Sequence, residues 1–365
     1  MTLVSRAPHA APPAVGDELL PRLHRELEDF LARAPDTAPE LAGALADLVL
    51  AGGKRVRPTF AWWGWRAAGG EAEGPRADAA VRALVALELL QGCALVHDDV
   101  MDRSATRRGR PTAHVAFATR HHRGRWAGDS RHYGDSAAVL VGDLALAWAD
   151  DALVTAGLDP AALARAWVPW RAMRTEMIAG QHLDLLAGAR REESLERALR
   201  VARFKTAAYT VERPLHLGAA LADAPPHLVD ALRSYGRDVG VAFQLRDDLL
   251  GVFGDTAVTG KPVGDDLREG KRTALMALAL GLARTADRPH AARLLRDCLE
   301  GQGVTERTVA EVRELLRDLG AVAAVEERID ALVASAGQAI DRVDLAGQAG
   351  PALTALAAGA TGRHR

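Results

Sequence analysis

The sequence predicts an all-α protein, and three observations support this. Of the 365 residues, 48% are hydrophobic but only 4% are aromatic. Ala, Leu, Arg and Glu, which favour helices, are abundant, whereas runs of the β-branched residues that favour strands are scarce. Apolar residues also recur at intervals of three and four residues, which is the spacing of one face of a helix.

The periodic segments give the expected helices in chain order. They are residues 18–31, 41–50, 78–100, 195–221, 227–250, 273–283 and 304–336. Without a solenoid-type repeat, these segments predict one all-α domain over residues 16–345. The Ala- and Pro-rich residues 1–15 and the final residues 346–365 are expected to be flexible tails. Glycines mixed with Arg, His and Asp predict a loop insertion at 120–135, whose basic run is more typical of a solvated loop than of an anion site.

Composition excludes several functional classes. A formal net charge of -2 argues against wholesale binding of nucleic acid. Cys93 and Cys298 are too few for a disulfide framework or a four-thiolate zinc site, which favours a reducing cytoplasm. The N-terminus lacks a signal-peptide pattern, and apolar stretches such as Ala274–Ala283 are too short to cross a bilayer, so we expect no stable membrane insertion.

A first aspartate cluster ends a long apolar helix. Asp98 and Asp102 are four residues apart, so their carboxylates project from one helical face with Asp99 alongside. Clustered carboxylates in apolar surroundings repel one another and need a cation. Oxygen ligands suit Mg²⁺, which commonly bridges carboxylates to substrate phosphates. The alternative is an acidic helix end paired with nearby arginines.

Two basic segments complement this cluster. Arg107 and Arg108 follow it directly, and guanidinium groups bind phosphate oxygens in pairs. Residues Gly52–Pro58 place Lys54 and Arg57 between a glycine turn and a helix start, where backbone amides also favour anions. This segment lacks P-loop spacing and, on its own, is evenly balanced between a phosphate site and an ordinary turn.

Five segments together resemble one family. The runs are Gly52–Pro58, Asp98–Gly109, Gly180–Gln181, Phe204–Thr206 and Phe243–Asp248, the last carrying a second aspartate cluster. Their order and spacing resemble those of the trans-isoprenyl diphosphate synthases, or polyprenyl synthetase family. The resemblance covers residues 18–340 and is greatest to bacterial geranylgeranyl diphosphate synthases.

The resemblance implies an isoprenoid synthase fold, a homodimer whose subunit is a single bundle of antiparallel helices around a deep central cavity. The aspartate motifs would face each other at its mouth and hold three Mg²⁺ ions per active site. By motif position, Asp98, Asp102 and Asp247 would be the leading metal ligands. Asp99 and Asp248 would support them.

The resemblance also implies the substrates and their contacts. Isopentenyl diphosphate would bind Lys54, Arg57, Arg108 and Gln91, and the allylic diphosphate would bind Lys205, Lys261 and Arg107. Lys205 and Arg107 would also act in catalysis, with Thr206 and Gln244 presenting negative dipole ends to the carbocation. Gln181 and Asp184 could support this site or simply join two helices.

The implied reaction condenses isopentenyl diphosphate with dimethylallyl, geranyl or farnesyl diphosphate, yielding geranylgeranyl diphosphate and releasing diphosphate. Cys93 and Ala94 are small residues just before Asp98, so a growing chain can pass them and stop at a floor formed by Leu90 or Leu89. The small residues could equally let two helices pack closely. The alternatives are a farnesyl or geranylfarnesyl diphosphate synthase, a class I terpene cyclase, and a non-catalytic partner subunit.

The second motif departs from the family pattern. Gly251 stands where a third carboxylate, four residues after Asp247, is usual. Asp255 follows one helical turn later, and its role stays open. Since the first aspartate of this motif is the main ligand implied by the resemblance, we expect activity to survive the change.

Overall fold

The computed structural model describes residues 18–33, 37–254, 264–301 and 304–362. Within them, helices form almost the whole structure, as expected, and β1 and β2 form one short hairpin. The expected tail at residues 1–15 lies outside the described residues, and so do Lys261 and Asp255.

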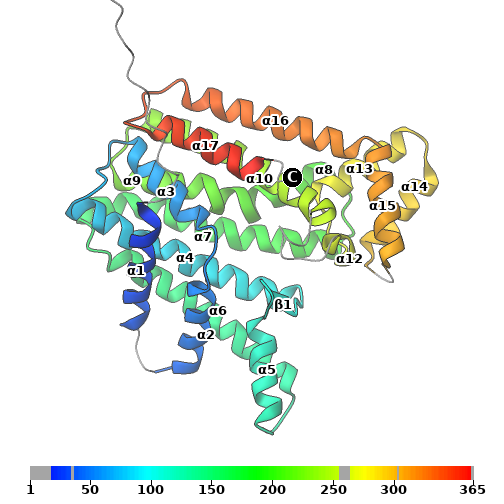
Figure 1. The fold of residues 1–365 in the computed structure, drawn as a ribbon, viewed down its shortest axis with the longest axis horizontal. Helices are drawn as coiled ribbons and strands as arrows, with labels where there is room; N and C mark the ends of the chain where they lie inside the picture. The colour runs from blue at the N-terminus through cyan, green and yellow to red at the C-terminus, as the bar shows by residue number, and fades with distance from the viewer. Residues whose placement is uncertain (1–17, 34–36, 255–263, 302–303, 363–365) are drawn as a thin grey trace, which may run out of the picture.

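The first half of the chain builds one side of the bundle. Its elements are α1 (Leu19–Ala32), α2 (Pro39–Leu50), α3 (Val56–Ala67), α4 (Pro75–Met101), β1 (Thr106–Arg107), β2 (Arg110–Pro111), α5 (Ala113–Arg123), α6 (Ser130–Val154) and α7 (Pro160–Ala189). Helix α4 packs against α6, and α5 extends beyond the rest of the bundle (Figure 1).

The second half completes the bundle. Its elements are α8 (Leu195–Val201), the π-helix η1 (Ala202–Glu212), α9 (Arg213–Leu221), α10 (Pro226–Phe253), α12 (Asp265–Arg268), α13 (Ala274–Thr285), α14 (Pro289–Leu299), α15 (Glu306–Asp318), α16 (Ala321–Ile340) and α17 (Ala349–Thr361). Helix α10 packs against η1 and α16. It carries the second aspartate motif, whereas the first motif is at the end of α4, so the two motifs come from opposite halves of the chain.

Helix α4 is the central core helix. It is the one described helix that is long and apolar enough to span a membrane, but 78% of its most apolar window is buried inside the protein. Leu84, Leu87, Leu89 and Leu90 are all essentially inaccessible to solvent. Burial of this helix on nearly all sides explains why its sequence is apolar throughout and not on one face alone.

The expectation of a flexible C-terminal tail at 346–365 was wrong for residues 349–361. Helix α17 packs against α3, α10 and α16. Ala349, Leu353 and Ala357 share a buried face at four-residue spacing, and the hydroxyl of Tyr235 donates to the carbonyl of Leu353 at 2.6 Å. The many small residues favoured a tail in the sequence, yet their helical spacing gives close packing against the bundle.

The loop predicted at 120–135 is also much shorter than expected. Helix α5 runs to Arg123 and α6 begins at Ser130, with the side chain of Asp129 capping α6 by accepting from the amide of His132 at 2.7 Å. His121 and Trp126 pack edge to face, and an imidazole nitrogen of His121 lies 3.0 Å from the carbonyl oxygen of Ala127. These contacts fold the basic run into a compact helix connection.

The expected helix boundaries differ elsewhere as well. The segment 304–336 forms two helices, α15 and α16, because Gly320 adopts a φ of 73° between them. The segment 195–221 forms three elements, with η1 in the middle. Helices α6 and α7 were not among the periodic segments, since charged and small residues interrupt their apolar pattern.

Candidate active site

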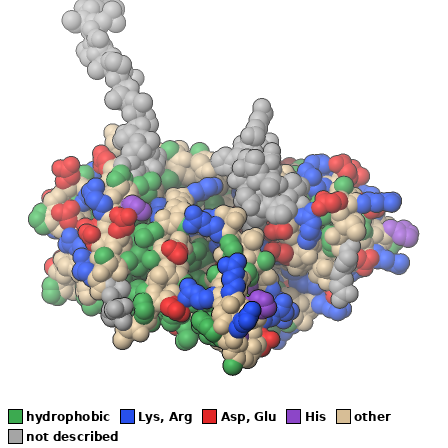
Figure 2. Space-filling model, turned by 60° about the horizontal axis from the view of Figure 1, so that its bottom comes forward, with side chains coloured by type: hydrophobic (Ala, Val, Ile, Leu, Met, Phe, Trp, Pro, Cys, Tyr) green, Lys and Arg blue, Asp and Glu red, His purple; other side chains and the backbone are tan. Residues whose placement is uncertain are grey.

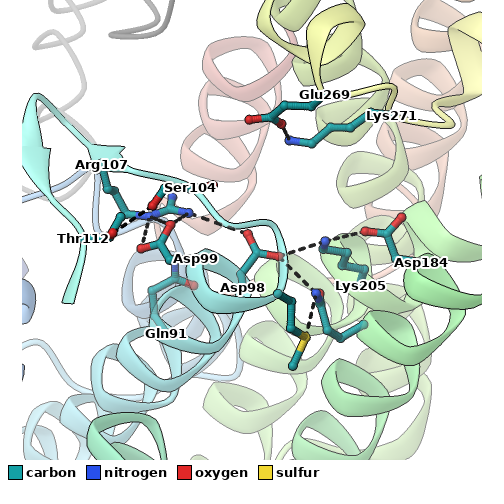
Figure 3. Close-up of polar contacts among 12 residues, drawn as sticks. Gln91, Asp98, Asp99, Ser104, Arg107, Thr112, Asp184, Lys205, Glu269 and Lys271 are labelled. Carbon is teal, nitrogen blue, oxygen red and sulfur yellow. Dashed lines mark hydrogen bonds and ion pairs between the residues drawn. The ribbon is translucent and has the colours of Figure 1, made fainter. Parts of the chain in front are cut away.

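The first aspartate motif lies at the C-terminal end of α4, where α7 and η1 meet it. The Nζ of Lys205 lies 3.0 Å from Oδ1 of Asp98, and Nε2 of Gln181 lies 3.2 Å from the same oxygen. On the other side, Nη2 of Arg107 is 3.6 Å from Oδ2 of Asp98. Figure 3 shows the Asp98 carboxylate between Arg107 and Lys205.

A tight hairpin explains how adjacent arginines serve different places. Arg107 pairs with Arg110 across the hairpin, and the turn residues Arg108 and Gly109 have φ values of 53° and 73°. The guanidinium of Arg107 therefore turns back to Asp99, with contacts of 2.7, 2.9 and 3.0 Å. The guanidinium of Arg108 instead donates to the carbonyl of Gly52.

The charges of this motif are unequal. Burial opposes the charged form of Asp98, but Lys205 and Arg107 hold its pKa below the usual value. Burial raises the pKa of Asp99, against the stabilising effect of Arg107. Burial and the charge of Asp98 raise the pKa of Asp102 to about 6. Asp98 is thus the carboxylate of this motif whose charged form is best stabilised.

Lys205 is positioned by a π-helical backbone. Its Nζ also binds Oδ2 of Asp184 at 2.6 Å, and these carboxylates keep its pKa above the usual value despite burial. A Cβ at Gly180 would lie 2.2 Å from the backbone nitrogen of Lys205, so only glycine lets α7 approach η1 this closely. Wide helical turns of this kind are frequent at functional sites.

The second aspartate motif lies on α10. Asp247 is exposed, whereas Asp248 is buried and accepts from Nε2 of Gln244 at 2.7 Å and from the amide of Ala274 at 3.3 Å. Burial raises the pKa of Asp248 to about 7. The hydroxyl of Thr206 donates to Oε1 of Gln244 at 2.5 Å, so the predicted Thr206 and Gln244 do lie together.

A buried arginine fixes the back of this motif. The Nη1 and Nη2 atoms of Arg246 donate to Glu326 of α16 at 2.7 and 2.6 Å, and its Nε donates to the carbonyl of Thr361 at 2.8 Å. Arg246 is 7% exposed. The end of α17 therefore sets the position of α10 one residue before Asp247.

Lys271 is a site residue that the sequence prediction did not include among its ligands. It lies after α12, with Nζ 2.7 Å from Oε2 of Glu269 and 3.4 Å from Oδ1 of Asp266. Burial opposes its charge, but these carboxylates and Asp102 hold its pKa above the usual value. In Figure 3 Lys271 lies across the site from the first motif. Its position after Gly270 in a Gly-Lys-Arg-Thr run was the available signal.

A separate basic cavity of about 280 Å³ lies beside the first motif. Its lining includes all the residues predicted for the second phosphate site, namely Lys54, Arg57, Gln91 and Arg108. Tyr209, which the sequence did not indicate, supports two of them. Its hydroxyl donates to Oε1 of Gln91 at 2.7 Å, and the guanidinium of Arg57 lies 4.0 Å from its ring centroid.

Arg55, which lies between these cations in the sequence, has a structural partner. Its guanidinium contacts the carboxylate of Glu88, which is 6% exposed, and donates to the carbonyl of Val49 at 2.6 Å. The backbone of Arg55 has a φ of 47°, so its side chain departs from those of its neighbours. Arg55 also lines the cavity, but these contacts tie its guanidinium to Glu88 and Val49.

The predicted chain-length residues lie in the core below the first motif. Leu90 is fully buried, Cys93 is 2% exposed, and Ala94 is partly buried. The thiol of Cys93 lies 3.7 Å from Nδ1 of His97, and a Cβ at Gly142 of α6 would overlap the His97 ring. Glycine at position 142 therefore allows α6 to pack closely against His97 of α4.

A family model for polyprenyl synthetases matches residues 38–316. This range holds both aspartate motifs, the basic cavity and Lys205. The chain belongs to the polyprenyl synthetase family. Its fold is the all-α isoprenoid synthase fold.

Relatives within this family carry different product names. The chain is 33% identical over 319 residues to a geranylfarnesyl diphosphate synthase of Aeropyrum pernix, covering 86% of this chain and 90% of that protein. It is 35% identical over 264 residues to a (2E,6E)-farnesyl diphosphate synthase of Mycobacterium bovis, covering 72% and 67%. Product length thus varies among proteins that resemble this one.

A solved structure is similar over nearly the whole chain. It is the geranylgeranyl pyrophosphate synthase of Corynebacterium glutamicum, complexed with isoprenyl diphosphate and magnesium. The TM-score is 0.90 at 44% identity, and the match covers 96% of this chain and 100% of that one. The polyprenyl synthetase fold is therefore retained from α1 to α17.

The carboxylates of this polyprenyl synthetase fit magnesium. Asp98 and Asp102 lie one turn apart on α4, Asp247 is exposed on α10, and all offer the oxygen ligands that Mg²⁺ prefers. Among the described residues, no three His, Cys, Asp or Glu side chains already converge as a metal centre. The negative charge that raises the pKa of Asp102 favours a cation arriving together with phosphate ligands.

Proposed function

We propose that this protein is a Mg²⁺-dependent trans-prenyltransferase that condenses isopentenyl diphosphate with dimethylallyl, geranyl or farnesyl diphosphate and makes geranylgeranyl diphosphate. The observation that carries the proposal is a pair of neighbouring cation clusters that could each bind a diphosphate. One is the basic cavity with Lys54, Arg57 and Arg108. The other combines Asp98 with Lys205 and Arg107. A reaction that joins two diphosphate substrates needs both.

Each residue has a defined task in this proposal. Magnesium, as three ions per site, would neutralise the allylic diphosphate and favour its departure. Asp98, Asp102 and Asp247 would hold the ions. Lys205 and Arg107 would bind the oxygens of the leaving group, where their charge counts most as the carbon–oxygen bond breaks.

The groups beside the reacting carbon are dipoles and not charges. Thr206 and Gln244 form a hydrogen-bonded pair between η1 and α10. Their oxygen atoms would stabilise the allylic cation without forming a bond to it. The alkene of isopentenyl diphosphate, held in the basic cavity, would then form a carbon–carbon bond to the allylic cation. The diphosphate that has left would take up the proton lost from the new cation.

Product length is assigned to the floor below Asp98. Cys93 and Ala94 would let a long chain pass, and Leu90 would stop it. Cys93→Phe should shift the main product to a shorter chain, and Val141→Leu, a buried change on the facing α6, serves as a packing control. An unchanged product from Cys93→Phe would reject the hypothesis that the chain passes Cys93 to a floor at Leu90.

We also propose a homodimer that works in the cytoplasm. Large apolar side chains are exposed on α6 and α7, among them Val139, Leu140, Val168 and Ile178. Figure 2 shows hydrophobic side chains at the surface, among charged ones. Exposed apolar groups on neighbouring helices are typical of an interface between subunits. Cys93 and Cys298 are both free thiols, as suits a reducing compartment.

A product assay tests the proposed function. The purified protein is incubated with Mg²⁺, isopentenyl diphosphate and each allylic diphosphate in turn, and the products are sized after removal of diphosphate. A main product of geranylgeraniol is expected. A main product of a different length would support a farnesyl or geranylfarnesyl diphosphate synthase, a cyclic hydrocarbon would support a terpene cyclase, and no release of diphosphate would support a partner subunit.

A further inference from the structure

The missing third carboxylate of the second motif has a structural counterpart. A Cβ at Gly251 would lie 1.9 Å from Oδ2 of Asp266 and 2.5 Å from its Cγ. Gly251 is helical, so its backbone conformation does not demand glycine. The space where a side chain at 251 would begin is therefore filled by the carboxylate of Asp266, which comes from α12.

Asp266 is held firmly in that space. It is 9% exposed, and the next residue, Leu267, is 2% exposed and belongs to the core formed by α10 and α13. The thiol of Cys298 donates to the carbonyl of Leu267 at 3.5 Å, and the amide of Lys271 donates to the carbonyl of Asp266 at 3.0 Å. These contacts fix the backbone that carries this carboxylate.

The remaining contact of Asp266 points into the site. Its Oδ1 lies 3.4 Å from Nζ of Lys271, the cation that faces the first aspartate motif. Asp266 therefore connects the helix that carries Asp247 with a cation on the far side of the site. A carboxylate at position 251 would have occupied the same place but would have been attached to α10.

We propose that Asp266 supplies the third carboxylate of the second aspartate motif from α12 and positions the divalent cation and Lys271 for the diphosphate. The inference rests on the proposed function, because it assigns a role within the same site. It makes Gly251 a required residue, since glycine alone leaves room for Asp266. Restoring the usual motif by Gly251→Asp should then be harmful and not helpful.

The test compares the wild-type protein with Asp266→Asn, Asp266→Ala, Gly251→Asp and the double variant Gly251→Asp/Asp266→Ala. Mg²⁺ binding in the presence of inorganic diphosphate is measured by calorimetry, and folding by the thermal midpoint. Asp266→Asn keeps the shape of the side chain and should weaken Mg²⁺ binding about tenfold while the midpoint stays within a few degrees. Asp297→Ala, an exposed change on the neighbouring α14, is the matched control.

The double variant decides between space and charge. Gly251→Asp alone should lower the thermal midpoint, because two carboxylates compete for one place. Moving the carboxylate back to α10 in the double variant should restore Mg²⁺ binding to within about threefold of the wild type. Wild-type affinity in Asp266→Asn would overturn the inference, and so would a double variant that binds Mg²⁺ no better than Asp266→Ala.

Failure of the proposed function gives a different result. In that case the wild-type protein makes no prenyl product, whereas the ranking of the variants in Mg²⁺ and diphosphate binding is still measured. If the wild-type protein elongates prenyl chains but all variants bind Mg²⁺ with equal affinity, the role of Asp266 is rejected and the proposed function stands.

Discussion

The two aspartate motifs differ in what holds them. Around the first motif, cations lie in front of the carboxylates, with Arg107 and Lys205 contacting Asp98 directly. Behind the second motif, a buried network of Arg246 and Glu326 fixes the helix itself. The first motif is organised by cations that are proposed to bind substrate, and the second is organised by contacts with the core.

This difference indicates where each motif can tolerate change. Contacts in front of a carboxylate must rearrange when metal and diphosphate arrive, so their loss should affect binding and rate more than folding. Contacts behind a helix keep its rotation and depth fixed, so their loss should affect folding first. Variants on each side therefore test the comparison directly.

The largest effect is expected from Asp98→Asn. The change removes a proposed metal ligand and one of the two carboxylate partners of Lys205, and kcat/KM should fall by about 10³-fold or more. Stabilisation of the protein by Mg²⁺ with inorganic diphosphate, measured as a rise in thermal midpoint, should disappear. Asp151→Asn, an exposed change on α6, should keep both. Full activity in Asp98→Asn would contradict the assignment of the first motif.

Arg246→Met should have the next largest effect, and on a different property. Glu326 loses this guanidinium partner inside the protein and Thr361 loses a donor, so the free energy of unfolding should fall by about 3 kcal/mol. Urea unfolding measures the change. The gain in thermal midpoint on adding Mg²⁺ and diphosphate should persist, unlike in Asp98→Asn.

The control for this variant is the double change Arg246→Met/Glu326→Leu. Replacing both charges with apolar groups avoids leaving the partly buried Glu326 without this guanidinium, so part of the lost stability should return. If Arg246→Met unfolds at the same urea concentration as the wild type, the contacts of Arg246 with Glu326 and Thr361 do not stabilise the helix that carries the second motif.

Much of the first motif could be predicted from sequence. Asp98 and Asp102 are close in the sequence, and helical periodicity alone puts them on one face. Arg107 follows Asp102 by five residues. The split between Arg107 and Arg108 was harder, because it depends on the backbone of the hairpin. Adjacent residues with the same side chain gave no sign of facing different sites.

The second motif was predicted less completely, since its surroundings come from distant segments. Asp266, from α12, is proposed to take the place of a carboxylate at position 251, whereas the sequence prediction considered only positions along α10. The helix α17, which meets Arg246, was expected to be a tail because small residues hide the apolar pattern. Tyr209 was missed because it acts through contacts with Gln91 and Arg57, which are far away in the chain. Lys271 was missed although its contacts with Glu269 and Asp266 are local.

Arg107→Lys tests the front of the first motif with a smaller change. Lysine keeps the charge but cannot reproduce the paired contacts to Asp99, so kcat/KM should fall about 30-fold with little loss of stability. Steady-state kinetics with varied allylic diphosphate measures this. Arg110→Lys, on the exposed partner strand, is the matched control. A fall in urea stability without a kinetic effect would mean that Arg107 only braces the hairpin.

The smallest effect is expected from Tyr209→Phe, which separates the basic cavity from both motifs. The change removes the hydroxyl that donates to Gln91 but keeps the ring under Arg57, so one hydrogen bond worth about 1 kcal/mol is lost. KM for isopentenyl diphosphate should rise roughly fivefold, while KM for the allylic substrate and kcat stay near the wild-type values. Tyr133→Phe, in the first turn of α6, should change none of these. An equal rise in both KM values would mean that the cavity and the first motif act as one site. Separate roles for the cations near the first motif, which are proposed to bind metal-bound diphosphate, and for the cations of the cavity would then have to be abandoned.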